Sequence, residues 1–364
     1  MALTDNAVIG NAVTGGAIDC DVHAAVPNMR VLLPHMDAYW REHMLRRGLE
    51  RDNFDLAAFP PQAPINARPD WKDGVAVPGS DLAAMQRHVL EPMGTSVAIL
   101  NVLHGAQAMM SEDLSAAMCR GINNWIAAEW LDRDKRLRAS IVVPMHSGDL
   151  AAEEIERLAG DKRFVQVLVL SMGEIPLGRR PMWPMFKAAE KHGLPIGIHA
   201  GSSFRHPPSA SGWGSTYFED YVTWATGFAG ALNSMTAEGV FQKFPELRVV
   251  LLESGVTWMP AHMWRINKTW RGVRSEVPWL NKLPSEILRE RVRMTAQPLD
   301  APEDAASLEQ VLEMIGGDHM LLFASDYPHW HYDGDDPVPP GLPAGVVRKM
   351  MTENPLATYP RLNA

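Results

Sequence analysis

Short runs rich in β-branched residues alternate with longer helical patterns along most of this chain, and this alternation constrains the fold more than any other feature. Several runs are apolar on both faces, as expected for parallel strands that are buried on both sides. Eight strand–helix alternations in one chain predict a (β/α)8 barrel. The predicted strands are Ala17–His23, Ser96–Asn101, Leu137–Met145, Phe164–Ser171, Leu194–Gly201, Leu247–Ser254, Val292–Gln297 and Met320–Asp326.

Two segments do not fit the alternation. Residues 28–80 form an insertion after the first strand, and residues 202–228 form a loop of mixed aromatic, Gly and Ser residues after the fifth. Because segments this long and this aromatic are rarely idle, we expect them to cover the barrel mouth or to make a homo-oligomer contact in a dimer or tetramer. The predicted helices are Asp113–Asp134, Asp149–Leu158, Pro181–His192, Ala229–Phe244, Trp258–Arg271, Pro284–Arg291 and Glu303–Ile315.

Composition is that of an ordinary globular protein and excludes several classes of partner. Of the 364 residues, 46% are hydrophobic and 21% are charged. The net charge of −9, without a basic run, argues against nucleic acid, and no apolar run is long enough to span a membrane. Two cysteines make no disulfide framework, and the chain opens without a signal-peptide pattern. We therefore expect a cytoplasmic protein with a single barrel domain over residues 1–364.

The stretch AIDCDVH, residues 17–23, places three polar side chains on one face of the first predicted strand. Asp19, Asp21 and His23 alternate with Cys20 and Val22, and side chains in a strand alternate between its two faces. Burying three polar groups on an apolar strand is costly unless something satisfies them. The candidates are water, the backbone and a metal ion.

Two further polar residues end other predicted strands. His199 ends the fifth strand in GIHAG, and Asp326 ends the eighth in FASDYPH. Because the carboxyl ends of barrel strands converge, we expect these residues to meet Asp21 and His23. Two carboxylates and two imidazoles form a mixed donor set that suits Zn²⁺ or Mn²⁺. Taken singly, a strand histidine such as His199 is more often a hydrogen-bonded core residue, Asp326 could cap a turn, and Asp21 could pair with His23.

Five stretches of the chain carry a more specific pattern in combination: IDCDVH, GIHAG, FQKFPELRVVLLESGVTWMP, PSEILRERV and LLFASDYPHW. They resemble the amidohydrolase-2 group of the metal-dependent amidohydrolase superfamily, which includes aminocarboxymuconate semialdehyde decarboxylase, γ-resorcylate decarboxylase and related hydrolases. The resemblance extends from about residue 17 to the closing TENPLATYPRL. It implies a distorted TIM barrel with one divalent metal ion, for which we expect Zn²⁺, with Mn²⁺ as the alternative. The metal ligands that it implies are Asp21, His23, His199 and Asp326.

Two departures from that family bear on the metal and the reaction. Many superfamily members bridge two metals with a carbamylated lysine at the end of strand four, but FVQVLVLSMGE contains no lysine, which indicates one metal. Related decarboxylases carry a histidine at the end of strand six, where LLESG has Glu253. A carboxylate there can act as a base or hold a water, but it would repel a substrate carboxylate. Glu253 could also form a buried salt bridge with Arg265.

From these residues we expect metal-assisted hydrolysis of an amide, ester, lactone or related bond in a small organic substrate. The metal would lower the pKa of its bound water towards about 7, and Asp326 would accept the proton of that water. The alternative on the same site is non-oxidative decarboxylation of an aromatic or unsaturated acid, in which Asp326 would protonate the ring carbon. A barrel that has lost catalysis and serves as a scaffold is a third possibility, which the intact ligand set argues against.

Other residues near the strand ends are candidates for supporting roles. His329 and His331, in DYPHWHYD, suit a proton shuttle, although both could be loop residues that only make hydrogen bonds. His104 after strand two, and Trp258 with Arg265 after strand six, are expected to line the substrate pocket. Arg265 would suit a substrate carboxylate, whereas Trp258 could simply pack its helix onto the barrel.

Overall fold

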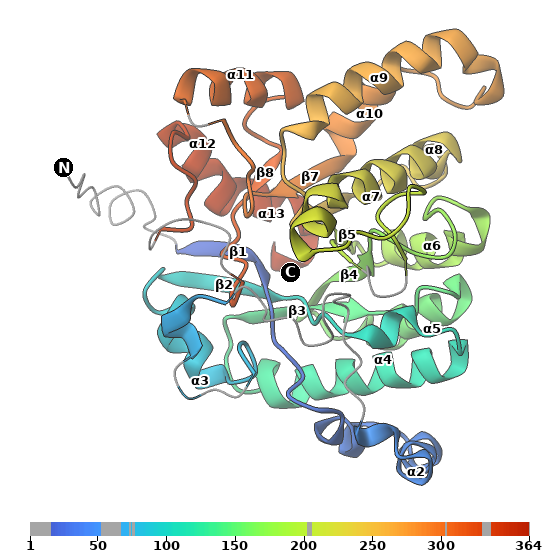
Figure 1. Ribbon diagram of the computed structural model, residues 1–364, viewed down its shortest axis with the longest axis vertical. Helices are drawn as coiled ribbons and strands as arrows, with labels where there is room; N and C mark the ends of the chain where they lie inside the picture. The colour runs from blue at the N-terminus through green and yellow to red at the C-terminus, as the bar shows by residue number, and fades with distance from the viewer. Residues whose placement is uncertain are drawn as a thin grey trace.

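Eight parallel strands pair in the order in which they occur along the chain, from β1 to β8, and helices surround them (Figure 1). The computed structural model describes residues 16–51, 67–72, 74, 77–201, 206–302, 304–329 and 336–363. The predicted (β/α)8 barrel is confirmed. Its strands are β1 (Ala17–Val22), β2 (Thr95–Leu100), β3 (Leu137–Val142), β4 (Phe164–Leu170), β5 (Ile196–His199), β6 (Val249–Leu252), β7 (Val292–Thr295) and β8 (Leu321–Leu322).

The barrel closes through the chain that follows β8. The backbone N–H of Asp326 donates to the carbonyl of Asp21 at 3.0 Å, and the N–H of His23 donates to the carbonyl of Tyr327 at 2.7 Å. The last strand, β8, ends at Leu322 and is shorter than the predicted Met320–Asp326, so Asp326 lies in a loop beyond it. These two hydrogen bonds hold that loop against the end of β1.

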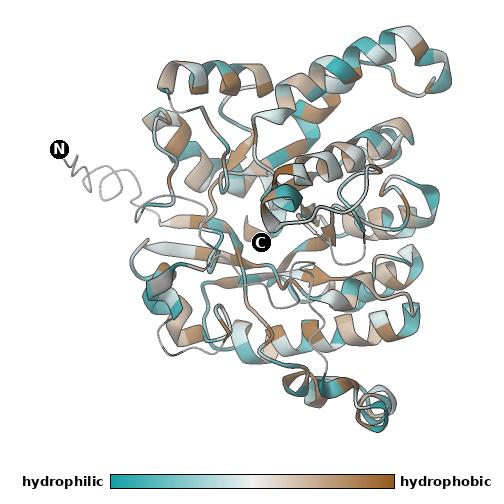
Figure 2. Cartoon of the chain, viewed as in Figure 1, coloured by the Kyte–Doolittle hydropathy of each residue, from teal (hydrophilic) through white to brown (hydrophobic). Residues whose placement is uncertain are grey.

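The strands form the hydrophobic core. Every residue of β1, β4, β5, β6 and β8 is buried. Hydrophobic residues gather along the strands, and hydrophilic residues cover the outer sides of the helices (Figure 2). This pattern is the one expected when helices cover the outer face of a parallel sheet.

The helices follow the strands as the alternation predicts. They are α2 (Ala38–Arg47), α3 (Leu82–Met85), α4 (Glu112–Ile126), α5 (Gly148–Leu158), α6 (Trp183–Lys191), α7 (Tyr217–Ala237), α8 (Val240–Lys243), α9 (Trp258–Val273), α10 (Pro284–Arg291), α11 (Ala305–Ile315), α12 (Ala344–Arg348) and α13 (Asn354–Thr358). Three wider π-helical turns flank them at Gln86–Leu90, Ala127–Leu131 and Lys349–Glu353. Short 3₁₀ turns occupy Met29–Val31, Leu33–His35, Leu49–Arg51, Pro69–Lys72, Gly105–Ala108, Arg180–Met182, Arg274–Glu276 and Pro360–Asn363.

One predicted element needs correction. The helix expected at Ala229–Phe244 begins at Tyr217 and is interrupted before α8 by Gly239, whose φ is 78°. Much of the expected loop at 202–228 is therefore helical, and residues 202–205 lie outside the described residues. The start is set by Thr216, whose hydroxyl accepts from the N–H of Glu219, while Glu219 accepts from the N–H of Ser215. This reciprocal capping marks a helix start.

The insertion at 28–80 is attached to the barrel at more than one point. Asn124 of α4 donates to the carbonyl of His35, and α2 extends away from the barrel at the lower edge of Figure 1. Residue 67 forms an antiparallel bridge with residue 329, so this part of the insertion lies against the loop after β8. None of the described helices has the length and apolar character needed to cross a membrane.

Candidate metal centre

Three polar side chains converge from β1 and β5. Asp21 lies in β1, His23 follows the end of that strand, and His199 is the last residue of β5. His23 Nε2 lies 3.5 Å from Asp21 Oδ1, and His199 Nε2 lies 3.9 Å from Asp21 Oδ2. One donor atom from each of the three lies within 4.8 Å of the other two. The structure thus brings together three of the residues that the resemblance implies as ligands.

The two imidazoles are oriented by backbone carbonyls. His23 Nδ1 lies 2.8 Å from the carbonyl of Asn101, and His199 Nδ1 lies 2.8 Å from the carbonyl of Ala200. A carbonyl can only accept, so each Nδ1 carries the proton and donates it. Each ring therefore turns Nε2 towards the carboxylates, which is the arrangement of a histidine that binds metal through a deprotonated Nε2.

A second group overlaps the first at the mouth of the barrel. His23 Nε2 lies 2.8 Å from Asp326 Oδ1, and His329 Nδ1 lies 3.0 Å from the same oxygen and 3.2 Å from Glu253 Oε1. One donor atom from each of these four residues lies within 4.8 Å of the others. Because His23 belongs to both groups, the two sets form one continuous cluster, and Glu253 Oε2 also lies 3.6 Å from His199 Nε2.

The backbone is strained where two of the carboxylates enter this cluster. Glu253 has a φ of 59° and Asp326 a φ of 55°, both in the left-handed region that residues with a side chain seldom adopt. Such strain costs about 1–3 kcal/mol per residue and is found mostly at functional sites. Both strained residues supply a carboxylate to the cluster.

Burial and neighbouring charge shift the pKa values of the cluster in opposite directions. Burial raises the pKa of Asp21 to about 8, against the lowering effect of His23. Burial lowers the pKa of His199 to about 4, so its ring is neutral at pH 7. For His23 and His329, burial lowers the pKa, but the adjacent carboxylates, Asp326 among them, outweigh it and the net shift is upward.

The donor set fits a divalent cation. Asp21 Oδ2 and His199 Nε2 are buried and have no hydrogen-bond partner among the described residues. Leaving such atoms unpaired is costly, and converging carboxylates repel one another. A cation bound between them satisfies both atoms and offsets the repulsion. Oxygen and imidazole nitrogen donors without thiolate suit Zn²⁺, Mn²⁺ or related ions. The residues of β4 are all buried and include no lysine, in keeping with one metal.

Two buried polar residues lie next to the cluster. The sequence grouped Asp19 with Asp21 and His23, and it gave no role to Asn101. Asp19 Oδ1 accepts from the N–H of Ser325 at 3.0 Å, Asp19 Oδ2 has no hydrogen-bond partner among the described residues, and burial raises the pKa of this carboxyl to about 7. Asn101 donates to Asp21 Oδ1 at 2.8 Å and accepts from Ser140 at 2.6 Å. The available signal for Asn101 was a polar residue that ends an otherwise apolar strand, just before the VLHG stretch.

The residues expected to line the substrate pocket are dispersed. His104 is buried after β2 and accepts from the N–H of Ala106 at 3.1 Å, and burial lowers its pKa to about 4. The indole of Trp258 donates to the carbonyl of Ser254 at 2.9 Å, which fastens the start of α9 to the loop after β6. Arg265 is exposed two turns further along α9, in a cavity that no residue of the cluster lines. His331 lies outside the described residues.

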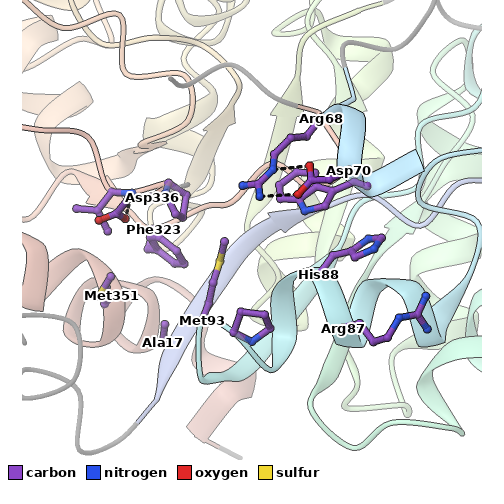
Figure 3. Close-up of a pocket in the computed structure, with 13 residues that line it drawn as sticks. Ala17, Arg68, Asp70, Arg87, His88, Met93, Phe323, Asp336 and Met351 are labelled. Carbon is purple, nitrogen blue, oxygen red and sulfur yellow. Dashed lines mark hydrogen bonds and ion pairs between the residues drawn. The ribbon is translucent and has the colours of Figure 1, made fainter. Parts of the chain in front are cut away.

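The loop that carries Asp326 also packs against the insertion. The hydroxyl of Tyr327 lies 3.1 Å from His88 Nδ1, and the ring of Tyr327 lies 5.0 Å from that of Trp71. Trp71 and His88 line a cavity of about 400 Å³, as do the paired side chains of Arg68 and Asp70 (Figure 3). No residue of the metal-ligand cluster lines this cavity, so it is separate from the candidate metal centre.

Comparison with known proteins matches the chain to one family. A family model described as Amidohydrolase matches residues 18–361. The chain is 24% identical over 265 residues to gamma-resorcylate decarboxylase of Polaromonas sp. strain JS666, covering 70% of this chain and 79% of that protein. It is similar to the crystal structure of 5-carboxyvanillate decarboxylase from Sphingomonas paucimobilis, with a TM-score of 0.67, 19% identity and coverage of 95% and 99%. It is also similar to dihydroxybenzoic acid decarboxylase from Polaromonas sp. JS666, a structure with bound manganese and 2-nitroresorcinol, with a TM-score of 0.63, 18% identity and coverage of 96% and 98%.

These findings correct the expected reaction. Because the relatives are decarboxylases, the prediction of hydrolysis is wrong, while the prediction of an enzyme is supported. The error has a physical reason: the motifs record the residues that hold a metal, and the same donor set can serve either reaction. The expected Zn²⁺ stays a prediction, since the metal found in a relative is manganese.

Proposed function

Because this chain belongs to the amidohydrolase family, we propose that it catalyses the metal-dependent, non-oxidative decarboxylation of a small hydroxylated aromatic acid. The names of its relatives support this reaction and this substrate class. The observation that carries the proposal is the position of Asp326 Oδ1, which lies between His23 Nε2 at 2.8 Å and His329 Nδ1 at 3.0 Å. A carboxyl group in that position can exchange a proton with one imidazole and remain beside the metal donors.

Four residues would hold one divalent cation: Asp21, His23, His199 and Asp326. Mn²⁺ is the ion we propose, since a relative binds manganese and all four donors are oxygen or imidazole nitrogen. When bound, such a cation supplies positive charge that orients and neutralises the oxygens of the substrate. The burial of the cluster strengthens this effect, because charges interact more strongly away from water.

Asp326 acts as the proton donor in this proposal. Its carboxylic proton passes to the ring carbon that bears the substrate carboxylate. The carbon–carbon bond then breaks, its electron pair returns to the ring, and CO₂ leaves. His329, whose side chain is 14% exposed, returns a proton from solvent to Asp326. One proton is consumed for each CO₂ released, and no water is split.

Glu253 holds His329 in place for this transfer. The sequence suggested that Glu253 would repel a substrate carboxylate, but its Oε1 lies 3.2 Å from His329 Nδ1. The imidazole N–H between the two carboxylates offsets part of their negative charge. The objection to decarboxylation that rested on Glu253 alone is therefore weakened.

The experiment uses purified, manganese-loaded protein with 2,6-dihydroxybenzoate, and with 5-carboxyvanillate as a second substrate. In D₂O we expect one CO₂ and one ring-bound deuterium for each product molecule. In H₂¹⁸O the aromatic product should carry no ¹⁸O. Turnover of esters, lactones or amides with ¹⁸O incorporation, and none of the aromatic acids, would contradict the proposal.

A further inference from the structure

Glu253 has a backbone conformation that residues with a side chain seldom adopt. Its φ is 59°, and such a conformation persists only where contacts from the surrounding structure hold it. The carboxylate of Glu253 lies 3.2 Å from His329 Nδ1 and 3.6 Å from His199 Nε2. Whatever fixes the backbone of Glu253 therefore also fixes a carboxylate within the cluster.

The side chain of Thr295 makes a contact of this kind. The paired positions of β6 and β7 end with Leu251 and Met294, so the backbone N–H of Glu253 lies just beyond the paired strands. Thr295 Oγ1 accepts from this N–H at 3.1 Å and lies 3.5 Å from the carbonyl of Leu251, to which it can donate. Thr295 is fully buried, so bulk water cannot replace the hydroxyl. The hydroxyl thus takes the place of a strand carbonyl where the backbone of Glu253 turns.

A second contact holds the residues that follow Glu253. The indole of Trp258 donates to the carbonyl of Ser254 at 2.9 Å and to that of Gly255 at 3.2 Å. These bonds fasten the loop to the start of α9, whereas the bond from Thr295 reaches Glu253 itself. Thr295 is therefore the residue whose loss would most directly release Glu253.

The direction of the Glu253 carboxylate decides which group it affects. Towards His329 it accepts an imidazole N–H, whereas towards the substrate it would repel a carboxylate. We propose that Thr295 is a positioning residue, whose hydroxyl holds the backbone of Glu253 so that the carboxylate is directed to His329. This inference rests on the proposed function, in which His329 returns a proton to Asp326.

Turnover of 2,6-dihydroxybenzoate by the manganese-loaded full chain tests this role. Thr295→Val keeps the shape of the side chain and removes the hydroxyl. We expect kcat to fall about tenfold, the scale of one buried hydrogen bond, and KM to stay within about twofold, because no proposed metal ligand is touched. Thr295→Ser keeps the hydroxyl and should restore most of the lost turnover.

Two further variants separate positioning from a general loss of stability. Thr358 is also fully buried, and its hydroxyl donates to the carbonyl of Asn354 at 2.7 Å, in α13. Thr358→Val should lose stability in urea as Thr295→Val does, but keep the parental kcat. Glu253→Ala should lower kcat, and addition of Thr295→Val to it should cause no further fall, because both residues act through one carboxylate.

Crystal structures of the manganese-loaded variants test the inference without turnover. In Thr295→Val the Glu253 carboxylate should lie more than about 3.5 Å from His329 Nδ1, beyond hydrogen-bond distance, and in Thr295→Ser it should stay within it. The inference is overturned if Glu253 keeps this contact in Thr295→Val, if Thr295→Ser is as slow as Thr295→Val, or if the effects of Thr295→Val and Glu253→Ala multiply. A parent protein that turns over no aromatic acid would contradict the proposed function alone, and the crystal structures would still decide the role of Thr295.

Discussion

Asn101 connects two of the residues proposed to hold the cation. Its side-chain amide donates to Asp21 Oδ1 at 2.8 Å, and its backbone carbonyl lies 2.8 Å from His23 Nδ1. Its side-chain carbonyl accepts from the hydroxyl of Ser140 at 2.6 Å, and Asn101 itself is fully buried. Asn101→Ala removes the side-chain bonds and keeps the backbone carbonyl. Asp21 therefore loses its orienting hydrogen bond while His23 keeps its own.

The expected loss can be worked out in two ways that agree. A hydrogen bond to a charged group contributes about 1.5–3 kcal/mol, and removal of a residue that orients a metal ligand typically lowers affinity about 10–100-fold, which corresponds to about 1.4–2.7 kcal/mol. We therefore expect Asn101→Ala to weaken manganese binding by 1 to 2 orders of magnitude. The free energy of unfolding of the metal-free protein should fall by about 1–3 kcal/mol, because the Ser140 hydroxyl also loses its acceptor.

Manganese affinity is measured by competition with a chelator, and stability by urea unfolding of the metal-free protein. Ser140→Ala is the matched control, since it removes a bond to Asn101 Oδ1 without touching Asp21. It should lose stability as Asn101→Ala does, but keep its manganese affinity within about threefold, because the ligand is still held. The reasoning is refuted if Asn101→Ala loses stability and yet binds manganese as tightly as the parent.

Three further predictions concern the metal, the proton and acid stability. Asp326→Asn keeps the size of the side chain but cannot give the proton, so turnover should fall at least about 10²-fold while metal is retained at reduced affinity, as metal analysis and kinetics would show. His199→Ala removes a buried Nε2 donor and should abolish stoichiometric manganese binding, as metal analysis of the purified variant would show. Hydrogen bonds from Arg136 lower the pKa of Asp134 to about 2, below the unfolded value of 3.8, so this carboxylate stabilises the fold above about pH 4 and less as pH falls towards 2. Urea unfolding of Asp134→Asn should therefore show a deficit of about 1–2 kcal/mol at pH 7 that shrinks below pH 4, whereas a pH-independent deficit would contradict the assignment.

Strand identity was predictable from the sequence, but strand ends were not. Runs that are apolar on both faces mark buried parallel strands, and all eight were found. The predicted third strand, however, ran to Met145, whereas β3 ends at Val142, and the predicted eighth ran to Asp326, whereas β8 ends at Leu322. Strand ends depend on where the neighbouring backbone stops pairing, and that information is spread over distant segments. The start of α7, by contrast, could have been predicted, because its capping signal at Thr216 and Glu219 is present in the sequence.

The alternation in AIDCDVH was informative for two residues and misleading for the third. Period-two alternation puts Asp19 on the same face as Asp21 and His23, yet the register of β1 against β2 shifts between Asp19 and Val22. Asp19 instead accepts from the N–H of Ser325, beyond β8. A register shift is a property of the paired strands, so the sequence of one strand cannot reveal it.

The type of reaction was the hardest inference, and Glu253 shows why. Considered alone at the end of a strand, a carboxylate disfavours a carboxylate substrate, and this favoured hydrolysis. In the folded chain its neighbour is His329, a residue of another loop, whose Nδ1 lies 3.2 Å from Glu253 and 3.0 Å from Asp326. The imidazole changes both the local charge and the direction in which a proton can move. If His329 reprotonates Asp326, Asp326 can donate a proton to carbon. Hydrolysis instead requires Asp326 to accept a proton from water. Both reactions use the same metal donors, so no single motif separates them, and the correction from hydrolysis to decarboxylation came from the relatives.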